Sequence, residues 1–264
     1  MAERWTVTAV RYGTLETTLS DLYYRYESYG EPDGPARMDY FFWVLRRDEE
    51  TILVDTGFHP DAGKRRGRAC LIEPAAAMAH LGVGPDTVAR LLVTHLHYDH
   101  IGNLDVLPDA ELIVPGREID FWLGPLGRRG QFALSSEEDE LAYVSAALDA
   151  DRVRLVRDDN EQVAEGVHVV VLGGHTPGQA AVVVQTATGP VVLASDAVHF
   201  YEELERDRPF AVFADLANMY TAYDTLRAIA GATGSLLVPG HDPAVMDRYP
   251  RVEGPAADFA VRIA

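Results

Sequence analysis

The residues best suited to metal binding or acid–base chemistry are concentrated at positions 94–100, where His95, His97, Asp99 and His100 fall close together. Three imidazoles and a carboxylate are costly to hold side by side unless a cation balances them. Imidazole and carboxylate are ligands that suit zinc and neighbouring first-row metals. The run predicts a loop that directs His95 and His97 at one metal and Asp99 and His100 at a second. The alternative is a chance cluster on the surface.

Three more residues of the same ligand types lie further along the chain, each after an apolar run. His175 lies in the glycine-rich turn 173–178, Asp196 follows Ser195, and His241 follows Gly240. A ligand type at the end of each of three predicted strands makes the chance cluster a much weaker explanation. Asp55, in the turn 55–57, would by itself be an ordinary turn residue.

Apolar and β-branched runs predict the strands that position these residues. The run 40–45 is almost continuously apolar, which is typical of a strand covered on both faces. The run 90–94 leads directly into the histidine cluster. The predicted strands are Thr6–Val10, Tyr40–Leu45, Thr51–Val54, Arg90–Thr94, Glu111–Val114, Val167–Leu172, Ala180–Val184, Val191–Ala194 and Leu236–Val238.

Helices are predicted between these strands, at Glu73–Leu81 before Gly82, at Ser136–Leu148 and at Leu216–Ile229. Ser135 or Ser136 with the following glutamates is a plausible helix start. Strand-rich halves that are each followed by helices indicate two packed sheets with helices outside. We therefore expect a single α/β domain over residues 1–264.

Two stretches are predicted additions to that core. Residues 22–38 contain four tyrosines and a Gly/Pro-rich turn, and residues 116–129 contain Phe121-Trp122-Leu123. These aromatic residues are either ordinary core or dimer contacts, or a hydrophobic wall over the active site.

The composition limits the classes of partner. Hydrophobic residues make up 47% of the chain and charged residues 24%, as in globular proteins. A net charge of −18 repels phosphate backbones, so we expect no nucleic-acid partner. The charge weakly favours neutral or cationic small molecules as substrates, although an acidic surface is also a common solubility device.

Other features of the chain favour a cytoplasmic protein. The first residues lack the pattern of a signal peptide. No apolar run is long enough to span a bilayer, so no membrane partner is expected. A single cysteine, Cys70, excludes an internal disulfide. It follows the basic stretch 64–68, and we predict that it is a buried structural thiol.

In these motifs and their spacing, the chain resembles the metallo-β-lactamase superfamily over essentially its full length. The resemblance implies an αββα sandwich, with two mixed β-sheets flanked by helices. It implies that His95, His97 and His175 bind one metal, that Asp99, His100 and His241 bind a second, and that Asp196 bridges the two with a hydroxide. Asp55 would then support the metal loop without binding metal.

Among the branches of the superfamily, the chain most resembles the N-acyl homoserine lactonase group, in overall length, ligand spacing and the metal loop. Common β-lactamases have a cysteine where this chain has Asp196, and they are exported. Glyoxalase II carries a long glutathione-binding region, for which the stretch after His241 is too short. Ribonuclease Z is disfavoured by the acidic charge.

One position differs from the lactonase group. That group often has a tyrosine three residues after the bridging aspartate, where it contacts the substrate carbonyl, and this chain has His199. We expect His199 to replace the tyrosine by hydrogen-bonding the oxyanion or donating a proton. His59 is a weaker candidate for lining the pocket, and His80 and His168 are given no role.

The resemblance predicts a lactonase that opens a cyclic ester, with N-acyl homoserine lactones (quorum-quenching substrates) first among the candidates. A metal-bridging hydroxide would attack the carbonyl, and Asp99 would carry the proton to the leaving oxygen. The cofactors would be two divalent ions per chain, Zn²⁺ first and Fe, Co or Mn as alternatives. A homodimer is what the resemblance suggests.

Three alternatives remain. The first is a hydrolase of another ester, a thioester or a cyclic amide. The second is a mononuclear-iron sulfur dioxygenase of the same fold, against which the complete second ligand set argues. The third, a non-enzymatic binding module, leaves seven converging ligand residues unexplained.

Overall fold

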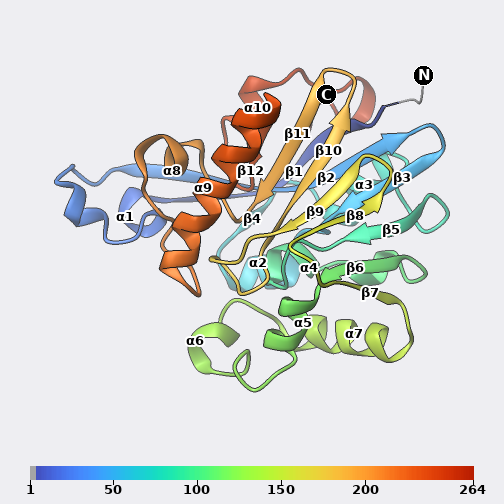
Figure 1. The fold of residues 1–264 in the computed structure, drawn as a ribbon, viewed down its shortest axis with the longest axis horizontal. Helices are drawn as coiled ribbons and strands as arrows, with labels where there is room; N and C mark the ends of the chain where they lie inside the picture. The colour runs from blue at the N-terminus through green and yellow to red at the C-terminus, as the bar shows by residue number, and fades with distance from the viewer. Residues whose placement is uncertain (1–3) are drawn as a thin grey trace.

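Two β-sheets lie face to face, with helices on both outer surfaces, in the computed structural model, which describes residues 4–264 (Figure 1). The larger sheet has eight strands in the order β13-β1-β2-β3-β5-β6-β7, with β4 paired to β1. Its strands are β1 (Thr6–Thr18), β2 (Pro35–Arg47), β3 (Glu50–Val54), β4 (Ala69–Cys70), β5 (Val88–Leu92), β6 (Glu111–Pro115), β7 (Val153–Val156) and β13 (Ala260–Arg262).

The smaller sheet has five strands in the order β12-β11-β10-β9-β8. In this sheet β11 pairs with β12 in parallel and the other neighbouring strands pair antiparallel, whereas in the larger sheet β3, β5, β6 and β7 pair in parallel. Both sheets are therefore mixed, as predicted. The strands are β8 (Asn160–Ala164), β9 (Val167–Val171), β10 (Ala180–Thr186), β11 (Gly189–Ser195) and β12 (Leu236–Pro239).

The helices are mostly short, and α9 is the longest of them in residues 4–264. In Figure 1, α5 and α7 lie beside β6 and β7 at the larger sheet, in green. The helices are α1 (Leu19–Leu22), α2 (Pro60–Arg65), α3 (Pro74–His80), α4 (Tyr98–Ile101), α5 (Gly116–Trp122), α6 (Gly130–Ala133), α7 (Glu138–Asp149), α8 (Tyr201–Arg206), α9 (Leu216–Thr233) and α10 (Val245–Arg248). Three 3₁₀ turns are η1 (Tyr26–Tyr29), η2 (Leu104–Val106) and η3 (Gly254–Ala256).

Strand β2 shows why the sequence forms this four-layer arrangement. Successive side chains of a strand point to opposite faces. Phe41 and Trp43 enter the core between the two sheets, and Tyr40 and Phe42 enter the core between the larger sheet and its helices. The prediction of a strand covered on both faces is confirmed.

The smaller sheet is covered on its outer face by α9. Met219, Tyr223 and Leu226 of this helix pack against Val192 and Ala194 of β11. These helical residues follow spacings of three and four, which places them on one face. The two sheets and their two helical coverings confirm the αββα sandwich.

The predicted elements all form, but some boundaries differ. Strand β1 runs to Thr18 rather than Val10, with a register shift between Arg11 and Gly13. The short strand β8 was not predicted, because its residues, Asn160–Ala164, carry little apolar patterning. Within residues 4–264, no helix combines the length and apolar character needed to cross a bilayer.

Two local predictions are wrong. Cys70 is exposed in β4, a two-residue strand that pairs with β1 and has both of its residues exposed. Neither Ser135 nor Ser136 caps α7, which begins at Glu138 without a side-chain cap. Ser135 instead belongs to the turn after α6, where its carbonyl accepts a hydrogen bond from the amide of Tyr98 at 2.9 Å.

Close backbone packing around Gly102 gives a test of how the fold positions the histidine loop. A Cβ at Gly102 would overlap the backbone of Phe58 and His59, so Gly102→Ala must push α4 away from the loop 57–59. We expect it to lower the free energy of unfolding by at least about 2 kcal/mol, measured by urea denaturation.

Gly231→Ala, in the exposed part of α9 with open space around it, is the matched control. It should be neutral or raise the free energy of unfolding by roughly 0.5–1 kcal/mol. An unchanged urea midpoint for Gly102→Ala would contradict the close contact between α4 and the loop.

Candidate metal centre

The predicted ligand residues follow strands whose carboxyl ends meet at one edge of the sandwich. His95 and His97 lie on the loop after β5, and His100 lies in α4, which continues that loop. His175, Asp196 and His241 follow β9, β11 and β12, which run in the same direction in the smaller sheet. The direction of the strands therefore places loops that are far apart in the chain at the same edge of the sandwich.

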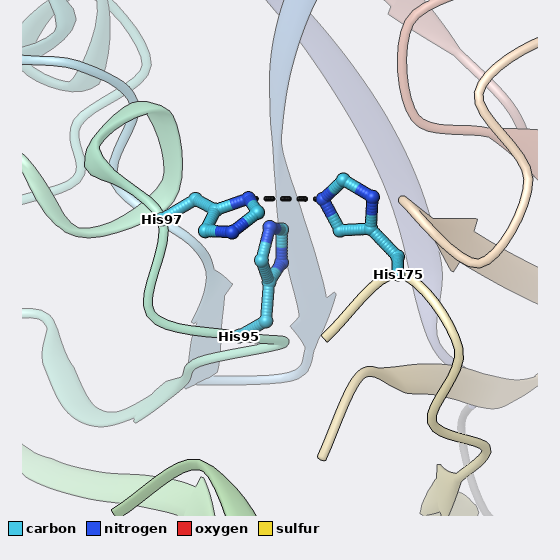
Figure 2. Close-up of side chains that lie close together, drawn as sticks. All are labelled: His95, His97 and His175. Atoms are coloured by element: carbon cyan, nitrogen blue, oxygen red, sulfur yellow. Dashed lines mark hydrogen bonds between the residues drawn. The ribbon is translucent and has the colours of Figure 1, made fainter. Parts of the chain in front are cut away.

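The first group contains three imidazoles, those of His95, His97 and His175. Their ligand nitrogens lie within 4.8 Å of one another, and all three residues are buried. Figure 2 shows the rings pointing toward one another, with Nε2 of His175 2.9 Å from Nδ1 of His97. Such a set of three convergent nitrogens is suited to one divalent cation.

The second group contains Asp99, His100 and His241, whose ligand atoms also lie within 4.8 Å of one another. His241 reaches it from the smaller sheet, and its Nδ1 contacts the backbone carbonyl of Asp39 at 2.8 Å. Because this contact fixes the ring, Nε2 of His241 is directed toward the group.

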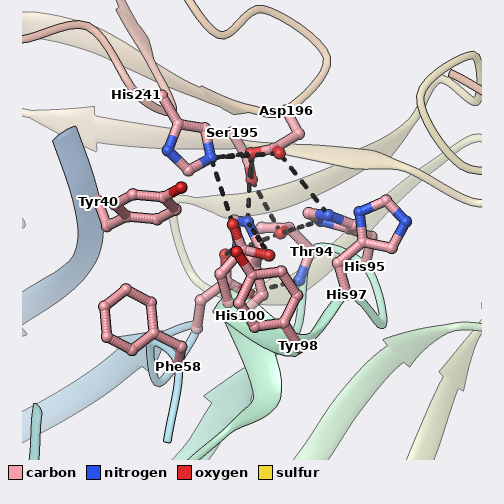
Figure 3. A network of polar contacts seen from close by, with 12 residues as sticks. Tyr40, Phe58, Thr94, His95, His97, Tyr98, His100, Ser195, Asp196 and His241 are labelled. Carbon is pink, nitrogen blue, oxygen red and sulfur yellow. Dashed lines mark hydrogen bonds and ion pairs between the residues drawn. The ribbon is translucent and has the colours of Figure 1, made fainter. Parts of the chain in front are cut away.

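Asp196 lies between the two groups (Figure 3). Its Oδ1 is 3.1 Å from Nε2 of His241 and 3.3 Å from Nε2 of His100. Its Oδ2 is 3.4 Å from Nε2 of His175 and 3.8 Å from Nε2 of His95. One carboxylate therefore contacts imidazoles of both groups.

The unpartnered nitrogens and the low pKa values of several imidazoles fit the binding of a divalent metal. Nε2 of His95 and Nε2 of His100 are buried without a hydrogen-bond partner, which is costly in a polar atom unless a ligand satisfies it. Burial lowers the pKa of His95 and His175 well below the ordinary histidine value and that of His97 to about 4. These rings are therefore neutral at pH 7, the form that binds metal.

The other charged groups of the site interact with the carboxylate of Asp196. Burial opposes charge on His100, but the carboxylates of Asp196, Asp55 and Asp99 raise its pKa well above the ordinary value. Burial also opposes charge on Asp196, but His241, His100 and His199 hold its pKa well below the usual range. The carboxylate is therefore ionised in its buried position.

Asp55 supports the metal loop without belonging to either group, as the sequence predicts. Its carboxylate accepts hydrogen bonds from the amide and the hydroxyl of Thr94, both at 2.8 Å. The same carboxylate lies 2.8 Å from Nδ1 of His100. It thereby fixes both the start of the loop and the orientation of one ligand ring.

Two residues of the site have a backbone conformation that is unusual for any residue but glycine. Asp55 has φ +60° and Ser195 has φ +48°. Their side chains meet through Thr94, whose hydroxyl is 2.9 Å from that of Ser195. Left-handed residues cost free energy and persist where the surrounding structure requires them. Here they let strands β3 and β11 turn sharply toward the ligands.

Sequence reasoning missed Glu118 in α5, which is completely buried. Its carboxylate accepts hydrogen bonds from the amide of Leu96 at 2.9 Å, the amide of Gly178 at 2.6 Å and the indole of Trp122 at 2.8 Å. It thus links the loop of His95 and His97 to the loop of His175. A glutamate at a helical position gives no such signal in one sequence.

His199, predicted as a catalytic residue, is completely buried behind Asp196. Its ring stacks on Phe210 at 3.7 Å between centroids, and its Nε2 is 3.2 Å from Oδ2 of Asp196. Its Nδ1 is 3.3 Å from Glu203, a buried acid that also accepts a hydrogen bond from the amide of Phe200. Sequence reasoning did not identify Glu203.

The other histidines lie outside both groups. His59 caps α2 by accepting a hydrogen bond from the amide of Asp61, and it lines a separate cavity rather than the one at the metal groups. His80 is exposed, and His168 lies 3.2 Å from the side chain of Asn160.

A cavity of about 410 Å³ opens above the two groups and is lined by His97, Asp99, His175 and Asp196. Leu22 and Met38, from the predicted addition at 22–38, line it as well. A neighbouring cavity of about 310 Å³ shares His97 and His175 and is lined by Phe121 and Trp122 of the addition at 116–129. Both additions therefore contribute apolar walls near the ligand groups, while Tyr23 and Tyr26 are buried core residues.

Comparisons with known proteins agree with this geometry. A sequence model described as "Metallo-beta-lactamase superfamily" matches residues 39–241. The chain is similar to N-acyl homoserine lactonase AttM from Azorhizobium caulinodans, with 27% identity over 192 residues that cover 72% of this chain and 70% of the relative. It is also similar to an N-acyl homoserine lactonase from Bacillus sp, with 23% identity over 215 residues that cover 76% and 80% of the two chains.

Among solved structures, the fold is similar to an N-acyl homoserine lactone hydrolase with the product N-hexanoyl-L-homoserine bound at the catalytic metal center. The TM-score is 0.76 and the identity 19%, and the match covers 94% of this chain and 97% of that chain. At this level of identity the similarity shows the fold.

Metal binding at this centre can be tested with one histidine inside it and one outside. His97→Ala removes a nitrogen of the first group and should lose most of the divalent metal retained after dialysis, as measured by elemental analysis. His80→Ala, at an exposed position, is the control and should retain the wild-type content. Equal metal content in the two variants would show that metal binds elsewhere.

Proposed function

The chain belongs to the metallo-beta-lactamase superfamily, and on that premise we propose that it is a metal-dependent hydrolase that opens lactone rings. N-acyl homoserine lactones are the first substrates to test. The observation that supports this most is the pair of ligand groups that share Asp196 on the lining of a cavity with apolar walls. The N-acyl homoserine lactonases among the relatives add support.

We further propose that two divalent cations are the cofactors, zinc first, with iron, cobalt and manganese as alternatives. His95, His97 and His175 would hold one, and Asp99, His100 and His241 the other, with Asp196 shared between them. Five imidazoles, three of them neutral and two held through Nδ1, together with Asp99 and a shared carboxylate are a donor set that suits these metals. When bound, such a pair of cations lowers the pKa of a water into the neutral range and polarises a carbonyl oxygen.

Asp99 is the side chain proposed to move the proton. Its carboxylate lines the cavity and is only 8% exposed. Its oxygens lie 4.0 Å from Nε2 of His100 and from Nε2 of His241, and its backbone carbonyl accepts a 2.7 Å hydrogen bond from Tyr12. A carboxylate fixed at this point can accept the proton of the attacking water and deliver it to the leaving alkoxide.

The apolar residues of the cavities are proposed to hold the rest of the substrate. Trp122 packs edge-on against His97, at 5.2 Å between ring centroids. Leu22 of α1 and Met38 of β2 line the adjoining cavity. Such walls bind an acyl chain and keep bulk water away from the carbonyl during attack.

The reaction class can be tested on protein loaded with about two equivalents of Zn²⁺ per chain. We expect a pH-stat to record acid release from N-hexanoyl-homoserine lactone, and the release to stop when a chelator removes the metal. The control is the same lactone with metal-free His97→Ala.

Hydrolysis of thioesters or cyclic amides but not of lactones, with the products followed by chromatography, would instead indicate another hydrolase of the family. Oxygen uptake with glutathione persulfide, at one iron per chain, would identify a sulfur dioxygenase instead.

His199 is proposed to be a positioning residue that acts through Asp196. It is completely buried and is absent from the lining of the cavities at the two groups, and it bridges Asp196 to Glu203. His199→Ala should therefore lower metal affinity by roughly 10–100-fold, measured by competition with a chromogenic chelator. Excess metal should then restore most of kcat.

The control for this prediction is His168→Ala, at a residue remote from the centre. The sequence suggests a different role, direct contact with the oxyanion. In that case His199→Ala would keep its metal affinity while kcat falls by about 10²–10³. His199→Tyr should then recover more turnover than the alanine variant.

A further inference from the structure

The cavity above the two ligand groups carries positive charge that the proposed hydrolysis does not use. Arg66 and Arg68, from the basic stretch 64–68, both line it. This is notable in a chain with a net charge of −18. The two arginines differ in whether their charge is already balanced by the protein.

The charge of Arg66 is neutralised by an acidic partner. Its Nη2 lies 2.8 Å from Oε1 of Glu137, and its Nε donates to the same oxygen at 3.1 Å. The guanidinium also lies over the ring of Tyr98, 4.1 Å from the ring centroid. Arg66 is therefore a structural residue of the cavity wall.

Arg68 has only neutral partners. Its Nε donates to the hydroxyls of Tyr40 and Tyr98 at 3.1 and 3.0 Å, and its Nη1 donates to the carbonyl of Arg66. Phenol hydroxyls ionise only at about pH 10, so both tyrosines are uncharged partners at neutral pH. Within residues 4–264, no carboxylate lies within 4.0 Å of the guanidinium.

The remaining nitrogen of Arg68, Nη2, has no protein acceptor in this described part of the chain and is not among its buried unpartnered atoms. It therefore remains open to solvent or to a ligand. Guanidinium nitrogens form short, charge-assisted hydrogen bonds to carboxylates, and arginine stays protonated throughout the physiological range.

The position of Arg68 connects it to the reacting centre. Tyr40, one of its partners, packs against the ring of His241 at 5.1 Å between centroids, and Tyr98 directly precedes Asp99. The guanidinium is thus separated from the ligand groups by one aromatic side chain. Asp21, the other charged residue of this cavity besides the ligands, is exposed and accepts hydrogen bonds from Thr17 and Thr18.

We propose that Arg68 binds an anionic group of the substrate, and that this enzyme therefore acts on lactones or related esters that carry a carboxylate. The proposal rests on the proposed function and specifies its substrate class. It also differs from the expectation of a neutral or cationic substrate that the net charge gives. Distant surface acids are screened beyond about 8 Å at physiological ionic strength, so they do not prevent an anionic group from pairing with the nearby guanidinium.

A matched pair of substrates isolates the charge. N-succinyl-homoserine lactone carries a terminal carboxylate, and its primary amide has nearly the same shape without the charge. For the wild-type enzyme we expect kcat/KM to be about 10-fold or more higher for the carboxylate, as one charge-assisted hydrogen bond provides. Added salt should reduce this ratio.

Arg68→Gln should bring the ratio of the two kcat/KM values close to one, and Arg68→Lys should retain part of it. Arg65→Gln is the matched control, because Arg65 lies in the same basic stretch, pairs with Glu137 and does not line this cavity. It should keep the wild-type ratio. An unchanged ratio in Arg68→Gln would overturn the proposal, since Arg68 would then only hold Tyr40 and Tyr98 in place.

Binding without turnover separates failure of this inference from failure of the proposed function. The γ-lactam analogues of the same two compounds can be titrated into the metal-loaded protein by calorimetry. If neither lactone is hydrolysed but the anionic lactam binds more tightly to the wild type than to Arg68→Gln, the anion site stands and the lactonase proposal fails. If the wild type does not distinguish the two lactams or the two lactones, the inference on Arg68 is wrong.

Discussion

The burial of one carboxylate, Asp196, is the constraint to which the rest of the site is adapted. A carboxylate that is 2% exposed is stable only if charge or hydrogen-bond donors surround it. Nitrogens of five buried histidines lie 3.1–3.8 Å from its oxygens, namely those of His95, His100, His175, His199 and His241. These five rings come from four loops, with His95 and His100 on the same one, so the fold has to bring four loops to one point. The sandwich does this because β5, β9, β11 and β12 all end at the same edge.

Other buried acids hold those loops by accepting backbone N–H groups. Asp55 fixes the start of the loop after β5, and Glu118 links that loop to the turn of His175. Glu203 does the same beneath His199. Loops lack the hydrogen-bond ladder of a sheet, so a carboxylate with two acceptor oxygens is an efficient way to join two of them. The stability of the loops and the geometry of the ligands are therefore two results of the same contacts.

Global and local charge have different consequences in this molecule. The net charge of −18 describes the surface as a whole and governs solubility and long-range attraction. The environment within the cavity depends on the few groups that line it, and there Arg66 is paired with Glu137 while Arg68 faces two phenols. Because ion pairing is decided by contacts of a few ångström, composition alone cannot give the sign of the potential at a binding site.

The sequence by itself predicted two packed sheets with helices outside, because its apolar runs predict the strands and a run such as 40–45 is apolar throughout, as in a strand covered on both faces. The family resemblance specified the αββα sandwich. The sequence also pointed to the seven candidate ligand residues, because it places histidines and acids at the ends of predicted strands, and the family resemblance grouped them. It could not identify Glu118 or Glu203, since a glutamate has the same local pattern on a helix whether it is solvated or buried. It likewise misplaced Cys70, whose exposure depends on where the short strand β4 pairs with β1. Only the tertiary structure decided which acids are buried, where His199 lies relative to Asp196, and which arginine lacks a partner, because these are contacts between segments far apart in the chain.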